Sequence, residues 1–325
     1  MRYKLLIFNA ESNTMYDYAP VTEKIIYTTN RKGSVGKLTF SFIKKNLINL
    51  TEGAKVQFYD DGAEVFLGFV FATEQDRWGI VSVTAYDQLR YLKSNASYSI
   101  EGKKLGEIIQ QIATDMQLQV GNLEDTGYVI KTLTKVNTEC LDIIEYGLGL
   151  TQNNTGKTFV FYDNFGKLYL TEAKNLMSDI LIGNGSIITD YTYKSDIDSD
   201  TYNQVKFVRS NKKNGQEDTY IFSDSNTINK WGLLRKYVNV DENLNEAQIN
   251  QQGNTMMAYY DRVLKTISID GVGGSPGLKA GAMAKLKIKD VPELSGGIFL
   301  LLDKVKHTFS NGEHSMSLEA KIKTL

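Results

Sequence analysis

Short stretches with alternating apolar and polar positions dominate the first 90 residues of the chain. In Leu38-Thr39-Phe40-Ser41-Phe42 the alternation is strict, so one face of this strand is expected to be buried and the other to face water. Asp60-Asp61-Gly62 lies between two apolar runs and predicts a hairpin turn, because Asp-Gly tolerates the positive φ that such turns require. This part is therefore expected to form an antiparallel sheet or barrel. Its predicted strands cover residues 3–8, 23–29, 37–42, 55–59, 65–71 and 80–86.

The apolar positions change to a helical period after residue 95. One apolar stripe predicts an amphipathic helix that begins near Leu105, and a second helix is predicted over residues 138–148. A hairpin with the turn Asp163-Asn164-Phe165-Gly166 follows. We therefore expect a small α+β insertion here. The first stripe consists of Leu105, Ile108, Ile109, Ile112 and Met116.

Strand patterns return from about residue 185 and continue to the end of the sequence, interrupted by one predicted helix. Asn243 followed by Glu246 resembles a capping box, and no proline occurs from there to Tyr260. The middle of this helix is polar and contains Gly253, so the helix is expected to fray there.

An internal repeat is the most informative pattern in the chain. Gly53-Ala54 is followed by a strand, a turn, an apolar strand and a third strand that ends near Tyr86. Gly281-Ala282 begins the same succession, which ends near Ala320. Chance similarity between two β meanders is the alternative, but we favour two related antiparallel barrels. The predicted fold class is mainly β with an α+β insertion, and the predicted domains are residues 1–94, 95–182 and 183–325, the last with an inserted helix near 243–260.

Composition and charge exclude several classes of protein. Hydrophobic residues make up 42% of the 325 residues, which is enough for a sizeable core. The 37 Lys and Arg residues against 38 Asp and Glu residues leave a net charge of −1, without the basic excess of a dedicated nucleic-acid binder. The apolar stretch after Met1 is too short for a signal peptide, and the run at 298–302 is only strand-sized. We expect a soluble protein made in the cytoplasm, with no membrane anchor and no sequence-specific nucleic-acid binding.

A phosphate-binding loop is suggested by Gly156-Lys157-Thr158, but the motif is incomplete. Thr151 stands where the first glycine of such a loop is required, and a strand pattern follows instead of a helix. Cys140 is the single cysteine, so it forms no internal disulfide, and nothing around it indicates a reactive thiolate.

A calcium loop is suggested by the spacing of Asp196, Asp198 and Asp200. Thr201 stands where the loop requires glycine, and Phe207 where it requires the bidentate glutamate. A solvated acidic loop before a strand is therefore the favoured interpretation.

The two histidines flank a predicted turn at Asn311-Gly312. A two-residue turn pairs Phe309 with His314 and places His307 and His314 on one apolar face. This face offers no third metal ligand, so we expect hydrogen-bonded packing residues rather than a metal site. No catalytic, cofactor-binding or metal-binding residue is assigned, and no cofactor is expected.

Five stretches together resemble the baseplate hub proteins of PBSX-type prophages. The match covers most of the chain in order, and the last stretch is the most specific. The stretches are Ala85-Tyr86-Asp87-Gln88-Leu89-Arg90-Tyr91-Leu92-Lys93, residues 155–168, Trp231-Gly232-Leu233-Leu234, residues 240–248 and residues 305–318.

This resemblance implies a structural, non-enzymatic component of a contractile phage tail or phage-tail-like particle (tailocin). It implies two tail-tube-like β-barrels per chain and a homotrimer whose ring of six barrels joins a six-fold tail tube to a three-fold spike. The implied partners are the chain itself, the central spike protein, the tail tube or tube-initiator protein, baseplate wedge and LysM-type hub-associated proteins, and the tape measure protein. The implied location is the baseplate of the virion, after synthesis in the bacterial cytoplasm.

Three alternatives make different predictions. A cell-wall hydrolase requires a cleft with an acid and a base of separated pKa. A carbohydrate-binding module requires exposed aromatic platforms, whereas the strand alternation here directs many aromatic residues inward. A pair of monomeric barrels predicts no partners at all.

Overall fold

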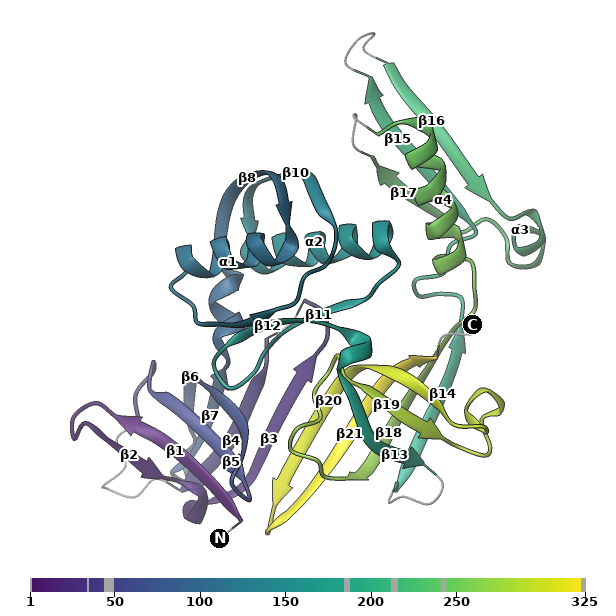
Figure 1. The fold of residues 1–325 in the computed structure, drawn as a ribbon. Helices are drawn as coiled ribbons and strands as arrows, with labels where there is room; N and C mark the ends of the chain where they lie inside the picture. The colour runs from purple at the N-terminus through teal and green to yellow at the C-terminus, as the bar shows by residue number, and fades with distance from the viewer. Residues whose placement is uncertain are drawn as a thin grey trace. The chain divides into compact units, whose positions relative to one another are not determined.

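The chain forms two compact units in a computed structural model, which describes residues 2–33, 35–43, 50–183, 188–211, 216–240 and 244–322 (Figure 1). One unit consists of Met1–Thr192 together with Ile267–Lys321, and the other consists of Tyr193–Thr266 with Ile322–Leu325. The described helices do not include one that is both long and apolar enough to cross a membrane.

A 13-stranded, mainly antiparallel sheet forms the framework of the first unit, and the end of β14 and the start of β18 lie within the bounds of the second. Its strands follow the order β14-β18-β21-β20-β3-β4-β7-β6-β5-β1-β2, and β19 pairs with both β13 and β20. The bounds are β1 Tyr3–Asn9, β2 Thr14–Asp17, β3 Thr22–Asn30, β4 Lys37–Ile43, β5 Lys55–Asp60, β6 Ala63–Gln75, β7 Ile80–Tyr86, β13 Met177–Gly183, β14 Asp190–Asp196, β18 Leu264–Gly273, β19 Met283–Lys287, β20 Ile298–Ser310 and β21 Glu313–Ile322.

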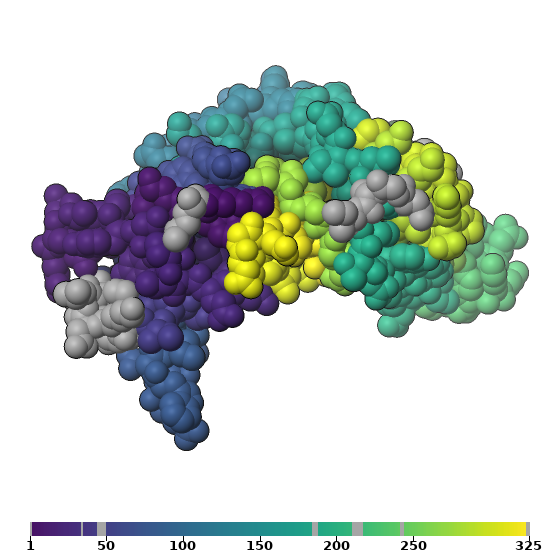
Figure 2. Space-filling view, turned by 90° about the horizontal axis from the view of Figure 1, so that it is seen from below, coloured from purple at the N-terminus to yellow at the C-terminus, as the bar shows by residue number. Residues whose placement is uncertain are grey.

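The mainly β class is confirmed, but two separate closed barrels are not what the described strands form. Their main hydrogen-bonded path ends at β2 and β14, a branch through β19 ends at β13, and β3 from the first half pairs with β20 from the second. Figure 2 shows the same relationship, with the yellow C-terminal part of the chain beside the purple N-terminal part. The physical reason is that β3 and β20 satisfy each other's backbone groups, which joins the two halves in one sheet.

The alternation of side chains along β4 produces the buried face that the sequence predicts. Leu38, Phe40 and Phe42 of β4 are buried, while the residues between them are partly exposed. The turn between β5 and β6 has positive φ at Asp61 and Gly62, which is the conformation expected of Asp-Gly.

The α+β segment between β7 and β13 contains both predicted helices. The apolar stripe of α1 packs against α2, β8 and β9, with Met116 at its end only partly buried, and β11 and β12 form the predicted hairpin. The helix α2 begins at Cys140 and continues past the predicted end at 148 to Thr155, where Gly156 caps it with a φ of 71°. The bounds are β8 Asn95–Lys104, α1 Leu105–Asp115, β9 Val120–Leu123, β10 Val129–Glu139, α2 Cys140–Thr155, β11 Phe159–Asp163 and β12 Leu168–Glu172.

The second unit is a three-stranded sheet covered by α4. Its helix is not capped by Asn243 and Glu246: the cap is Asn245, and its capping box is completed by Gln248. Asn243 itself lies outside the described residues. The elements are β15 Gln204–Asn211, β16 Gln216–Ser223, α3 Ser225–Trp231, β17 Arg235–Asn239 and α4 Glu246–Tyr260; short 3₁₀ helices elsewhere cover Ala19–Val21, Gln88–Lys93, Ala173–Asn175 and Pro292–Leu294.

The expected fraying of α4 is wrong, because Gly253 serves close packing. The helix is continuous through this glycine, which is buried. A Cβ atom at Gly253 would lie 2.3 Å from the ring of Phe222 on β16. The glycine therefore lets α4 approach the sheet at a distance that a side chain would prevent.

Candidate assembly site

The repeat seen in the sequence is present as two meanders with the same backbone hydrogen bonds. The N–H of Gly53 donates to the carbonyl of Val70, and the N–H of Val70 donates to the carbonyl of Ala54. In the second meander, the N–H of Gly281 donates to Leu302, and the N–H of Leu302 donates to Ala282. The distances are 2.8 and 2.9 Å in both cases.

Both glycines require a positive φ, which is 81° at Gly53 and 94° at Gly281. The alanine that follows each glycine donates to the carbonyl three residues before it, Thr51 in one meander and Lys279 in the other. The same tight turn therefore leads into both meanders, and glycine is required because other residues are strained at these φ values.

The two meanders also share an irregularity of register. Val70 pairs with Ala85 and the register then shifts at Phe71; Leu302 pairs with Ala320 and the register then shifts at Asp303. A bulge at the same place in both strands bends both sheets in the same way. We take this as strong support for a structural duplication.

The duplication extends to the order of the strands. The first half follows β3-β4-β7-β6-β5-β1, and the second half follows β14-β18-β21-β20-β19-β13. One difference lies at the end of this series, where β1 pairs with β5 in the antiparallel sense and β13 pairs with β19 in the parallel sense.

The two halves meet where β3 pairs with β20 over seven residue pairs, from Lys304 opposite Asn30 to Ser310 opposite Lys24. An ion pair closes one end of this junction, since the Arg31 Nε atom donates to Asp303 Oδ1 at 2.6 Å. Both partners are largely buried, with side-chain exposures of 12% and 25%. The junction is therefore a specific contact between two sheets, held by main-chain pairing and a shielded charge pair.

Both histidines lie in this region and are buried, in the predicted register. His307 Nδ1 lies 2.9 Å from His314 Nε2, and His314 Nδ1 lies 3.0 Å from Asp60 Oδ2. Asp60 in turn accepts from Arg2 at 2.6 Å. The expectation of hydrogen-bonded packing histidines is confirmed, and the chain of contacts links the β20–β21 hairpin to the end of β5.

Burial decides the charge state of these histidines. It lowers the pKa of His307 to about 3, and the neighbouring His314 adds to the shift. Burial also lowers the pKa of His314, although the charge of Asp60 opposes that effect. His307 is therefore neutral at physiological pH, which suits a structural hydrogen bond.

A buried polar cluster joins the insertion hairpin to the sheet, and sequence reasoning missed it. Asp87 accepts from the N–H groups of Gly36 and Leu89, at 2.9 and 3.1 Å. Burial raises the pKa of Asp163 to about 6, and burial and the charge of Asp163 raise that of Asp87. Burial lowers the pKa of Lys279, whose ammonium group donates to the Asn164 side chain at 2.9 Å. The sequence around Asp163 is typical of an exposed turn and does not indicate that this carboxylate is buried near Gln88 and Lys279.

The other residues that the sequence suggested as phosphate-binding, reactive or calcium-binding take part in turns, packing and local hydrogen bonds. Gly156 ends helix α2 and is followed by strand β11, so the glycine precedes a strand as predicted and does not begin a helix. Cys140 is buried, and burial raises the pKa of its thiol. Asp196 accepts from the N–H groups of Asp198 and Ser199 and binds Lys194 at 2.8 Å. Among the residues that the structure describes, no three His, Cys, Asp or Glu side chains gather as a metal site.

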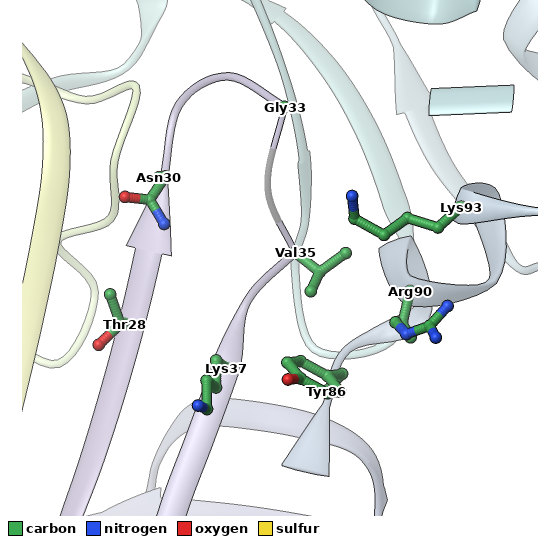
Figure 3. Close-up of a pocket in the computed structure, with 8 residues that line it drawn as sticks. All are labelled: Thr28, Asn30, Gly33, Val35, Lys37, Tyr86, Arg90 and Lys93. Carbon is green, nitrogen blue, oxygen red and sulfur yellow. The ribbon is translucent and has the colours of Figure 1, made fainter. Parts of the chain in front are cut away.

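A basic hollow of about 360 Å³ lies beside the ends of β3 and β4. Lys37, Arg90 and Lys93 line it together with Val35 and Tyr86 (Figure 3). Their charged ends point in different directions around Val35 and Tyr86. The hollow therefore does not present a converging set of cations to one anion.

Solved structures place the fold in a known class. The chain is similar to the 43 kDa tail protein of prophage MuSo2 from Shewanella oneidensis, with a TM-score of 0.70 and 11% identity over 98% of each chain. It is also similar to the E. coli c3393 protein, a type VI secretion component described as structurally similar to the T4 tail proteins gp27 and gp5. That match has a TM-score of 0.56 and 9% identity, and covers 94% of this chain and 74% of that one. The fold is therefore that of prophage tail proteins.

Sequence comparison then defines the family. The YqbQ-like family model matches residues 25–321. The uncharacterized protein YqbQ of Bacillus subtilis is 31% identical over 92% of this chain and 91% of its own length. The phage-like element PBSX protein XkdQ of the same organism is 31% identical over 83% of this chain and 82% of its own. The chain belongs to the YqbQ-like family, and the resemblance to PBSX-type proteins is confirmed.

Proposed function

We propose that this chain is a structural hub protein of a phage-type tail baseplate. In this proposal three copies form a ring of six similar modules, two from each chain, which joins a six-fold tail tube to a three-fold central spike. The duplicated meander carries the proposal, because two modules with the same turn, bulge and strand order can occupy equivalent places around one ring.

The proposed domains follow from the same duplication. Residues 1–94 and 183–325 would supply the two tube-like barrel modules, and residues 95–182 would form an insertion between them. Each module would become part of a closed barrel only when neighbouring copies join it in the ring, which accounts for the open strand path of a single chain. The protein acts by matching symmetries and transmitting force, and performs no catalysis.

The proposed partners are those of a baseplate hub. They are the spike, the tail tube or its initiator, wedge and LysM-type proteins, and the tape measure protein. The chain would be made in the bacterial cytoplasm and assembled into the baseplate of the virion. The family membership and the fold shared with prophage tail proteins support this assignment. The near-neutral charge suits a lumen that lets DNA pass without holding it.

The experiment that tests the proposal is a measurement of solution mass by light scattering, alone and after co-expression with the spike protein. A trimer, or a complex of three hubs with three spike chains, is expected. A chain that stays monomeric in the presence of both spike and tube proteins would contradict the hub function. A wall-hydrolysis assay and a glycan pull-down, both expected to be negative, separate the enzymatic and carbohydrate-binding alternatives.

A further inference from the structure

The duplication leaves one junction without its counterpart inside the chain. In the second half, β20 pairs with β3 from Lys304 onward, two residues after Leu302. The equivalent position in the first half is Ala72, two residues after Val70. The pairing of β5 with β6 ends with Lys55 opposite Phe69, so among the described strands the segment from Ala72 to Glu74 pairs only with β7.

The strand that would complete this junction is β14. In the second half, β14 is the equivalent of β3, because β14 lies beside β18 and β3 lies beside β4. The strand β3 continues on its other side to β20, whereas β14 ends the path of the described strands (Figure 1). The sequence of β14, Asp190-Tyr191-Thr192-Tyr193-Lys194-Ser195-Asp196, contains neither proline nor glycine, and none of its residues is fully buried.

An extended edge strand of this kind pairs readily with another strand unless it is protected. The segment Ala72–Glu74 of β6 offers such a partner, since β7 is the one described strand with which it pairs. The contact between β3 and β20 shows that these two types of edge fit each other within one chain. The same geometry is therefore available between two chains.

We propose that β14 of one copy pairs with β6, from Ala72 onward, in the next copy, reproducing the contact between β3 and β20. This proposal rests on the proposed trimeric hub and names the surface that closes it. The contact is head-to-tail, because one copy supplies β14 and the other supplies β6. Three such contacts alternate with three internal junctions around the ring, which leaves no copy with an open edge at these strands.

The direction of the backbone groups identifies a residue for the test. The N–H of Thr189 donates to the carbonyl of Asp270 on β18. Successive residues of a strand direct their N–H groups to opposite sides. In a regular antiparallel pair, the N–H of Thr192, three residues later, faces away from β18 and toward the proposed partner.

Disulfide trapping tests the pairing directly. Thr73 corresponds to Val305, which lies opposite Thr29 in the internal junction. Thr73→Cys is combined with a second cysteine at one position at a time across residues 190–195. Each double variant and the wild-type chain, assembled alone or with the spike protein, are then exposed to mild oxidation. We expect one or two adjacent positions to give covalent trimers on denaturing gels.

Single-cysteine variants separate this contact from a symmetric one. A head-to-tail contact leaves each single variant uncrosslinked, whereas pairing of β14 with β14 yields covalent dimers from one cysteine. Dimers from the single variants, or no crosslink at any position in a proven trimer, would overturn the proposal. The wild-type chain provides the background, since its one thiol at Cys140 is buried.

A proline substitution provides a second, independent readout. Thr192→Pro removes the outward N–H and leaves the N–H groups that face β18 in place. It is expected to weaken trimer formation at least tenfold while its thermal unfolding stays close to that of the control Thr192→Ala, which keeps the trimer. A trimer unaffected by proline contradicts the proposed pairing but leaves the hub function standing; a wild-type chain that never assembles contradicts both.

Discussion

His307 Nδ1 lies 2.9 Å from His314 Nε2 inside the β20–β21 hairpin, and both rings are buried. The pair bonds at one end to the carbonyl of Leu278 and at the other to Asp60. Removing one ring leaves buried polar atoms without hydrogen-bond partners, which destabilises the fold.

His307→Phe is expected to destabilise the first unit by roughly 2–4 kcal/mol, because two buried hydrogen bonds lose a partner. The pKa of His307 is lowered in the folded state, so the unfolded chain binds the proton more tightly and stability falls as pH decreases from about 6.5. The variant should lose this part of the pH dependence. Urea unfolding at pH 7 and pH 5 measures both effects; an unchanged dependence on pH would contradict the assignment.

Asp163→Asn should affect the pH dependence of stability in the opposite sense to His307→Phe. Burial raises the pKa of Asp163 to about 6 in the folded state, so its contribution to stability is present at low pH and is lost as pH rises from about 4 to 6. At pH 8 the variant avoids the burial of a charge and should be more stable than the wild type by roughly 1–3 kcal/mol. At pH 4 the difference should be close to zero. A variant that is equally destabilised at both pH values would show that the Asp163 carboxylate is needed for packing alone.

Gly53 and Gly281 offer a matched comparison between the two halves. Each has a positive φ, so alanine at either position should cost roughly 1–2 kcal/mol. A Cβ atom at Gly281 would also lie 2.3 Å from Val160, whereas at Gly53 it meets no atom within 4 Å. Gly281→Ala should therefore lose a further 1–3 kcal/mol or so by overpacking. Equal losses in chemical denaturation would mean that Val160 moves away at little cost.

The ion pair at the internal junction should matter more than an exposed pair nearby. Arg31→Ala leaves the largely buried Asp303 without its partner and is expected to cost roughly 1–3 kcal/mol. Lys304→Ala is the control, because Lys304 and Glu319 are exposed and such pairs contribute about 0–1 kcal/mol. Thermal or urea unfolding distinguishes the two. If both variants lose the same small amount, main-chain pairing alone holds β3 to β20.

Local patterns determined much of this molecule. Strict alternation predicted the buried face of β4, and the turn at Asn311-Gly312 predicted that Phe309 lies opposite His314. The repeated Gly53-Ala54 and Gly281-Ala282 motifs predicted the two meanders. These features depend on the period of the side chains and on the φ that each residue tolerates, which are properties of short segments and so can be read along the chain.

Other features were decided only when distant segments met. The capping residue of α4 is Asn245 rather than Asn243, and Gly253 serves close packing against Phe222 rather than a frayed turn. The burial of Asp87 and Asp163 and the pairing of β3 with β20 join segments far apart in the sequence. Main-chain hydrogen bonds carry no side-chain signature of their partner, and the cost of burying a carboxylate depends on what surrounds it. Strand patterns therefore predicted the elements, whereas the tertiary structure selected which edges pair and which charges are buried.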